Sequence, residues 1–129
     1  MSAGQIIIYL FIGFIIFSYL RKFLNNKKIE HYDPIEVNKR MKNQNNMLLL
    51  DVRTDPERKR GHIKGSVHIP LNQLRKREQE LEKYKGKEIV CYCRSGSRSL
   101  NAAVFLHKKG FNVSNLKGGI SAWNYQNQK

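Results

Sequence analysis

The residues most able to do chemistry lie in one short stretch, CYCRSGSRS, at positions 91–99. Cys93 follows an apolar run and precedes a sequence that can start a helix, so backbone N–H groups of the intervening turn can point at its sulfur. Gly96 permits that turn, and Arg94 and Arg98 add positive charge. These features favour a thiolate and lower the thiol pKa below its usual ~8.5. The stretch predicts a nucleophilic cysteine, or a site for an anionic sulfur, sulfo or phospho group. The simpler alternative is a buried cysteine before an ordinary turn.

Two buried strands are expected to position these residues. The apolar run at 47–52 has the length and composition of a strand that is buried on both faces, and the stretch 88–92 is expected to form another strand. The first run is followed by Arg53 and contains Asp51 near its end, and the second ends just before Cys93. Ligands of parallel sheets bind beyond the carboxyl ends of the strands, so both segments indicate one edge of the sheet.

The rest of the chain alternates between strand-like and helix-like patterns. The further elements expected are a helix beginning at Asp33, a short strand within 65–70, a helical stretch at 71–84, a helix at 99–110, a strand within 111–119 and a last helix from Ile120. This alternation predicts an α/β domain with a small, mainly parallel sheet flanked by helices.

An uncharged apolar segment, IIIYLFIGFIIFSYL, occupies positions 6–20. Extended to 3–24, it would be roughly 33 Å long as a helix, against a hydrocarbon core of ~30 Å. Arg21 and Lys22 follow this segment and no basic residue precedes it, which predicts a single-pass anchor in the cell (inner) membrane with the rest of the chain in the cytoplasm. A signal peptide would begin with basic residues and end in a small-residue cleavage site, and the segment has neither. A buried core helix is the other alternative, but apolar residues occur on every face of this segment. We therefore expect an anchor at 1–24, a linker at 25–32 and one domain at 33–129.

The formal net charge of +14 predicts anionic partners, which include small anionic substrates and lipid headgroups. Nucleic acid is not expected, because the basic residues are spread along the chain without a groove-reading motif. The two cysteines are too few for a disulfide-stapled domain, and the four histidines are scattered, so no metal site is expected. Cys91 should lie on the same side of its strand as Cys93. We expect it to be a small buried apolar residue, with a resolving thiol as the alternative.

Four segments together resemble the rhodanese, or sulfurtransferase, domain family. They are LLLDVR at 48–53, GHIKGSVHIPL at 61–71, CYCRSGSRS at 91–99 and LKGGISAW at 116–123. The resemblance covers about 33–123, and the whole chain resembles bacterial single-domain rhodanese-like proteins that carry an N-terminal membrane helix. It implies the rhodanese α/β fold and no metal or organic cofactor.

The resemblance also implies a mechanism and assigns roles to the site residues. Cys93 would take the outer sulfur of a donor such as thiosulfate as a persulfide, and a thiol, cyanide or a protein acceptor would then remove it. The backbone of the loop would bind the persulfide, with Arg98 facing the anionic donor and Arg94 as the second choice. The loop residues are Arg94, Ser95, Gly96, Ser97, Arg98 and Ser99. Asp51 and Arg53 match the family's DVR motif and are expected to pin the loops by hydrogen bonds.

Two other functions are weighed against this one. A persulfide carrier or docking module for a membrane partner would keep Cys93 without turnover of its own. A cysteine-dependent phosphatase or arsenate reductase would place five residues between cysteine and arginine, whereas four separate Cys93 from Arg98. The shorter loop suits a sulfur atom better than a phosphate.

Overall fold

The sheet at the centre of the domain contains only parallel strand pairs. The computed structural model describes residues 1–27, 29–43 and 46–127. Its sheet has the order β1-β5-β4-β2-β3. The strands are β1 (Glu30–Tyr32), β2 (Met47–Asp51), β3 (Val67–His68), β4 (Glu88–Tyr92) and β5 (Asn112–Leu116). β4 therefore lies between β2 and β5, and its carboxyl end opens at the middle of one sheet edge.

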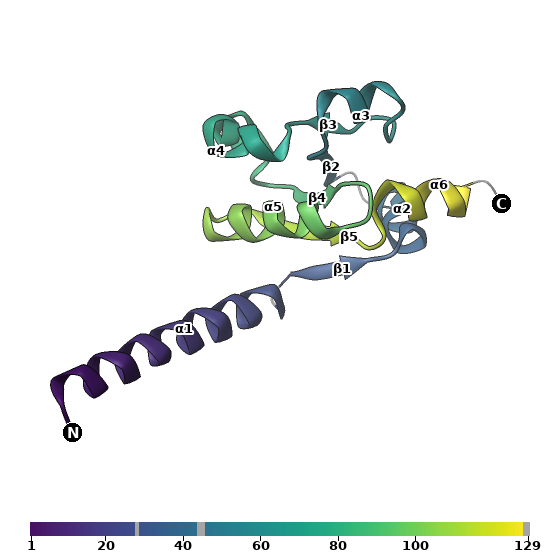
Figure 1. The fold of residues 1–129 in the computed structure, drawn as a ribbon. Helices are drawn as coiled ribbons and strands as arrows, with labels where there is room; N and C mark the ends of the chain where they lie inside the picture. The colour runs from purple at the N-terminus through teal and green to yellow at the C-terminus, as the bar shows by residue number, and fades with distance from the viewer. Residues whose placement is uncertain (28, 44–45, 128–129) are drawn as a thin grey trace.

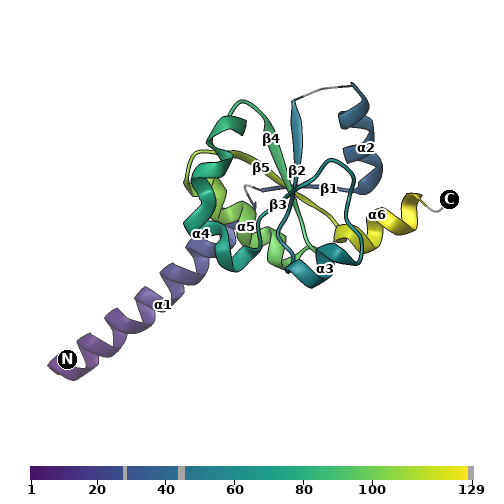
Figure 2. The same ribbon diagram turned by 90° about the horizontal axis from the view of Figure 1, so that it is seen from above.

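Helices cover both faces of the sheet. The helices of the chain are α1 (Ala3–Lys27), α2 (Pro34–Asn43), α3 (Asp55–Lys59), α4 (Leu74–Arg77), α5 (Ser97–Lys108) and α6 (Gly119–Asn127), with 3₁₀ segments at Leu71–Gln73 and Glu78–Tyr84. Figure 2 shows α4 and α5 on one side of the sheet and α2 and α6 on the other. This architecture confirms the predicted α/β fold.

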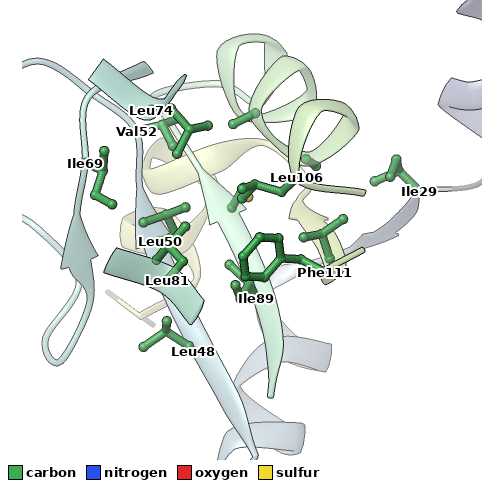
Figure 3. Close-up of a cluster of buried hydrophobic side chains, with 14 of the residues drawn as sticks. Ile29, Leu48, Leu50, Val52, Ile69, Leu74, Leu81, Ile89, Leu106 and Phe111 are labelled. Atoms are coloured by element: carbon green, nitrogen blue, oxygen red, sulfur yellow. The ribbon is translucent and has the colours of Figure 1, made fainter. Parts of the chain in front are cut away.

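The alternation of side chains along β4 divides the buried residues into two clusters. Ile89, Cys91 and Cys93 face the cluster under α5, part of which Figure 3 shows. Val90 and Tyr92 face the cluster on the side of α2 and α6. Because successive side chains of a strand point to opposite faces, a strand buried on both sides needs apolar side chains on both faces, as residues 89–91 provide here.

Three local features differ from the sequence-based expectations. The expected linker at 25–32 contains β1, which pairs with β5, and Ile29 beside it is only 3% exposed. The stretch 71–84 is not one helix but is divided between 3₁₀ and α segments, although Leu74 and Leu81 are buried as expected. The sequence analysis did not predict α3, which is stabilised by reciprocal capping hydrogen bonds between Thr54 and Glu57.

The N-terminal helix α1 projects away from the domain in both views (Figures 1 and 2). Its stretch Ala3–Leu24 is long and apolar enough to cross a membrane, and none of it is buried. Large apolar side chains such as Phe11, Phe14 and Phe17 are exposed. The helix therefore does not serve as the core helix of this domain.

Candidate functional site

Cys93 lies one residue beyond the end of β4, where the chain turns back into α5. Gly96 makes this turn with a φ of 111°, in the left-handed region that glycine tolerates best, and α5 begins at Ser97. The turn brings the start of α5 against the cysteine, whose side chain is only 1% exposed. The sulfur thus lies beneath the loop, at the carboxyl edge of the sheet.

The loop donates hydrogen bonds to the Cys93 sulfur. The Gly96 N–H is 3.1 Å from the sulfur, and the Ser99 hydroxyl is 3.4 Å from it. Burial opposes ionisation of the thiol, but hydrogen bonds from the Ser99 hydroxyl and from backbone N–H groups outweigh burial and lower the pKa of Cys93. Those N–H groups belong to Ser95, Gly96 and Ser99. The loop is therefore arranged to stabilise negative charge on this sulfur.

A buried asparagine that the sequence analysis missed supports the loop from β5. Asn115 is 3% exposed, and its amide nitrogen donates to the Gly96 carbonyl at 3.2 Å. Its side-chain oxygen accepts the Ser99 hydroxyl at 2.6 Å. A hydroxyl has one proton, so the Asn115 oxygen and the Cys93 sulfur compete for it. The same amide also contacts Nδ1 of His31 on β1 at 3.2 Å, which links the edge strand to the loop.

Asp51 and Arg53 form a buried network next to β4. The Asp51 carboxylate accepts hydrogen bonds from the Arg53 guanidinium at 3.0 and 2.9 Å and from the Tyr92 hydroxyl at 3.0 Å. Arg58 adds an ion pair at 3.3 Å. The Tyr92 hydroxyl also contacts Ser66 at 2.9 Å, so the network joins three loops at this edge. These contacts match a role in holding loops rather than in touching the sulfur.

Asp51 stays ionised in this network. Its burial raises the pKa of the carboxyl, but the hydrogen bonds from Arg53, together with its charge, outweigh burial and lower that pKa. A buried carboxylate with two guanidinium partners is costly to leave unpaired, so the network is rigid.

Arg98 is held by an acidic residue that the sequence analysis did not single out. Its guanidinium forms a bidentate ion pair with Glu57 of α3, at 2.7 and 2.9 Å. The Arg98 guanidinium beside Glu57 lowers the pKa of the Glu57 carboxyl to about 2. In this structure the positive charge expected to face the donor is therefore neutralised. Glu57 and Arg98 are 41 positions apart, and α3 was not predicted, so no local pattern indicated the pair.

Arg94, the second choice for the anion contact, borders a cavity of about 430 Å³. The wall of this cavity includes Arg60, His62, Arg94, Ile120 and Ser121. The wall is hydrogen-bonded to the loop that contains Cys93: the Ile120 N–H donates to the Cys93 carbonyl at 2.9 Å, and the Ser121 N–H donates to the Arg94 carbonyl at 3.2 Å. The cavity therefore lies next to the backbone of this loop.

Two adjacent glycines, Gly118 and Gly119, lie next to the loop where α6 begins. Gly119 has a φ of 60°, and a Cβ there would overlap the backbone of Cys93 and Arg94. The LKGG segment thus lets two backbones approach closely directly under the cysteine.

Cys91 and Cys93 are both buried, but the pKa values of their thiols are shifted in opposite directions. Both cysteines are free, and Cys91 is fully buried, as predicted. Burial raises the pKa of the Cys91 thiol to about 12, with a smaller contribution from the neighbouring Cys93. Within residues 1–27, 29–43 and 46–127, no three His, Cys, Asp or Glu side chains cluster as metal ligands would.

A family model described as "Rhodanese-like domain" matches residues 33–126. The chain belongs to the rhodanese-like family. A protein named "Sulfurtransferase" from Allochromatium vinosum is 34% identical over 96 residues, which cover 74% of this chain and 88% of that relative. The rhodanese-related protein from Thermoplasma volcanium has a structure that matches with a TM-score of 0.68 at 30% identity, covering 75% of this chain and 92% of that one. The crystal structure of reduced Bacillus anthracis CoADR-RHD matches with a TM-score of 0.67 at 35% identity, covering 74% of this chain and 16% of that one. The relatives of this chain thus include proteins named as sulfurtransferases and a protein from Bacillus subtilis named as a putative sulfur carrier.

Proposed function

We propose that the chain is a membrane-anchored sulfurtransferase that moves a sulfane sulfur from a donor such as thiosulfate to a thiophilic acceptor through a persulfide on Cys93. The observation that carries the proposal is the hydrogen bonding of the Cys93 sulfur by the Gly96 N–H and the Ser99 hydroxyl, which stabilises an anionic sulfur. The rhodanese-like relatives support the same chemistry.

The first half-reaction loads the cysteine. The Cys93 thiolate attacks the outer sulfur of thiosulfate, and a bond forms between the two sulfurs. The sulfur–sulfur bond of thiosulfate breaks, and its electron pair leaves with sulfite. The persulfide that remains is anionic, and the N–H groups of the loop that point at Cys93 can stabilise it.

The second half-reaction discharges the persulfide. Cyanide or a thiolate attacks the outer sulfur, and the electron pair of the broken bond returns to Cys93 as the thiolate. The products are thiocyanate or a new persulfide. Neither half-reaction requires a metal or an organic cofactor, because sulfur is both the nucleophile and the group transferred.

The two cysteines have separate roles in this proposal. Cys93 is the nucleophile because hydrogen bonds lower its pKa. Cys91 is a core residue, because a thiol with a pKa of about 12 in a fully buried position does not ionise near neutral pH. Asp51 and Arg53 hold the neighbouring loops in place.

The helix α1 anchors the enzyme in the membrane in this proposal. Its exposed apolar surface needs a cover, and its apolar stretch is long enough to span a bilayer. Arg21 and Lys22 lie at the C-terminal end of that stretch, after its uncharged part at 6–20, so the domain would face the cytoplasm.

The test is sulfur transfer from thiosulfate to cyanide by the full chain in detergent micelles, with Cys93→Ser and Cys91→Ser as the paired variants. Mass spectrometry after incubation with thiosulfate alone would detect the mass of one added sulfur atom. We expect loss of turnover and of the added sulfur only in Cys93→Ser. A persulfide on Cys93 without turnover would instead favour a carrier that serves a dedicated partner. If neither turnover nor an added sulfur is detected, the proposal is rejected.

A further inference from the structure

Two donors to the Cys93 sulfur are held in place by one buried amide. The Gly96 N–H and the Ser99 hydroxyl lie 3.1 and 3.4 Å from the sulfur. The Asn115 nitrogen donates to the Gly96 carbonyl at 3.2 Å, and the Asn115 oxygen accepts the Ser99 hydroxyl at 2.6 Å. Because Asn115 is 3% exposed and Ser99 is fully buried, the orientation of this amide fixes where both donors lie.

The hydrogen-bond partners of the Asn115 amide determine which way it points. The Gly96 carbonyl can only accept, so the amide nitrogen must face it. That nitrogen has two hydrogens, and it also lies 3.2 Å from Nδ1 of His31. Nδ1 is therefore an acceptor, which places the proton of the neutral ring on Nε2. Among the residues that the structure describes, no third acceptor bonds this nitrogen, so His31 is needed to satisfy the amide.

His31 reaches the amide from the edge of the sheet. It lies on β1, which follows the apolar helix α1 in the chain, and the register of β1 against β5 pairs it with Asn115. His31 is exposed, whereas Asn115 and Ser99 are buried. A chain of hydrogen bonds thus runs from an exposed ring on the edge strand to the buried sulfur of Cys93.

We propose that His31 is a positioning residue for sulfur transfer at Cys93, acting through the Asn115 amide on the donors that face the sulfur. This inference rests on the proposed sulfurtransferase function. Without the Nδ1 acceptor, one N–H of a buried amide loses its partner, which is costly. The amide would then turn toward another acceptor and loosen its bonds to Gly96 and Ser99. The strand β1 is accordingly part of the site and does not only close the edge of the sheet.

The experiment separates the acceptor from the bulk of the His31 side chain. His31→Leu removes the acceptor, whereas His31→Asn places a carbonyl oxygen near the position of Nδ1. The control is His107→Leu, which changes an exposed histidine of α5 outside this chain of hydrogen bonds. All variants carry Cys91→Ser, so that Cys93 is the only thiol in the full chain.

Two rates are measured for the full chain in detergent micelles. One is the alkylation of Cys93 by iodoacetamide as a function of pH, and the other is persulfide formation from thiosulfate. In His31→Leu the alkylation profile should move to higher pH, and both rates should fall about fivefold below the midpoint of the profile, as expected for one weakened hydrogen bond. His31→Asn should stay within about twofold of the Cys91→Ser parent, and His107→Leu should match the parent.

A double-mutant cycle tests whether His31 acts through the amide. In an Asn115→Ala background, His31→Leu should change neither rate further, because the amide that it holds is absent. The same fall in both backgrounds would overturn the inference.

An unshifted alkylation profile in His31→Leu would also overturn it, because a residue that only supports the sheet edge would not set the thiol pKa. So would a His31→Asn variant as impaired as His31→Leu. Absence of a persulfide in the Cys91→Ser parent would instead reject the proposed function, and the inference with it. The alkylation profiles distinguish these failures, because alkylation needs no sulfur donor.

Discussion

Replacing Glu57 by glutamine tests whether the ion pair with Arg98 stabilises the loop that contains the cysteine. The pair is bidentate, at 2.7 and 2.9 Å, and it joins α3 to the start of α5. Glutamine keeps one acceptor oxygen and the shape of the side chain but removes the charge. The variant therefore removes the charge and one of the two hydrogen bonds from Arg98, while the size of the side chain is unchanged.

The expected loss of unfolding free energy in Glu57→Gln follows from the lowered pKa of Glu57. The drop in its pKa from 4.5 to about 2 would correspond to at most ~3.5 kcal/mol of folding free energy, at ~1.4 kcal/mol per pH unit. The Arg98 side chain is 36% exposed and that of Glu57 is 24% exposed, so solvent screens part of this energy. We expect Glu57→Gln to lower the free energy of unfolding by about 1.5 kcal/mol at pH 7.

The contribution of Glu57 to stability depends on pH in a direction that follows from its lowered pKa. The folded state lowers the pKa of Glu57, so its stabilisation is complete above pH 4.5 and is lost as the pH falls from 4.5 through about 2. The difference between the unmodified chain and Glu57→Gln should therefore shrink toward zero over that window. Urea unfolding of the full chain in detergent can be followed by the fluorescence of Trp123, its single tryptophan, which packs against a buried cluster.

A matched control is Glu82→Gln, which breaks an exposed pair with Lys85 at 3.2 Å and should cost less than about 0.5 kcal/mol. The reasoning is refuted if Glu57→Gln and Glu82→Gln have the same small effect at pH 7. It is also refuted if the effect of Glu57→Gln is unchanged between pH 7 and pH 2, since the carboxylate charge would then not be its cause.

Three further variants test other contacts of the site. Ser99→Ala removes a hydroxyl donor to the Cys93 sulfur, so the pH–rate profile for alkylation of Cys93 by iodoacetamide should move to higher pH. At pH values below the midpoint of that profile, alkylation should slow about tenfold. Tyr92→Phe leaves a buried N–H without its partner and deprives a buried carboxylate of a donor, so urea unfolding should show a loss of about 1–3 kcal/mol. Gly119→Ala should be destabilised by at least ~2 kcal/mol in the same assay and should lose sulfur transfer, because a Cβ meets the backbone under the loop and φ is positive.

Each of these three predictions would be contradicted by a specific result. An unshifted alkylation profile in Ser99→Ala would show that the backbone N–H groups alone stabilise the thiolate. Unchanged stability in Tyr92→Phe would mean that water replaces the hydroxyl. Full activity in Gly119→Ala would show that the loop tolerates displacement.

Most of the elements, though not β1 or α3, and the position of Cys93 could be predicted, because local sequence patterns indicate them. The run 88–92 is β4, and its apolar residues at 89–91 indicate burial on both faces, which is typical of a central parallel strand. Cys93 follows that strand and precedes the start of a helix, so its place at the carboxyl edge of the sheet needed no knowledge of distant residues. The full burial of Cys91 follows from the same alternation.

The partners of the site residues could not be predicted, because tertiary contacts join segments that no sequence period relates. The sequence alone determined an α/β domain with an anion-stabilising cysteine loop after its central strand, behind an apolar N-terminal helix. Only the tertiary structure decided that Glu57 neutralises Arg98, that Asn115 supports the loop, and that Arg94 lies beside a cavity. The physical reason is that hydrogen bonds and ion pairs depend on distances of about 3 Å between side chains, and these are set by how the elements pack rather than by local propensity.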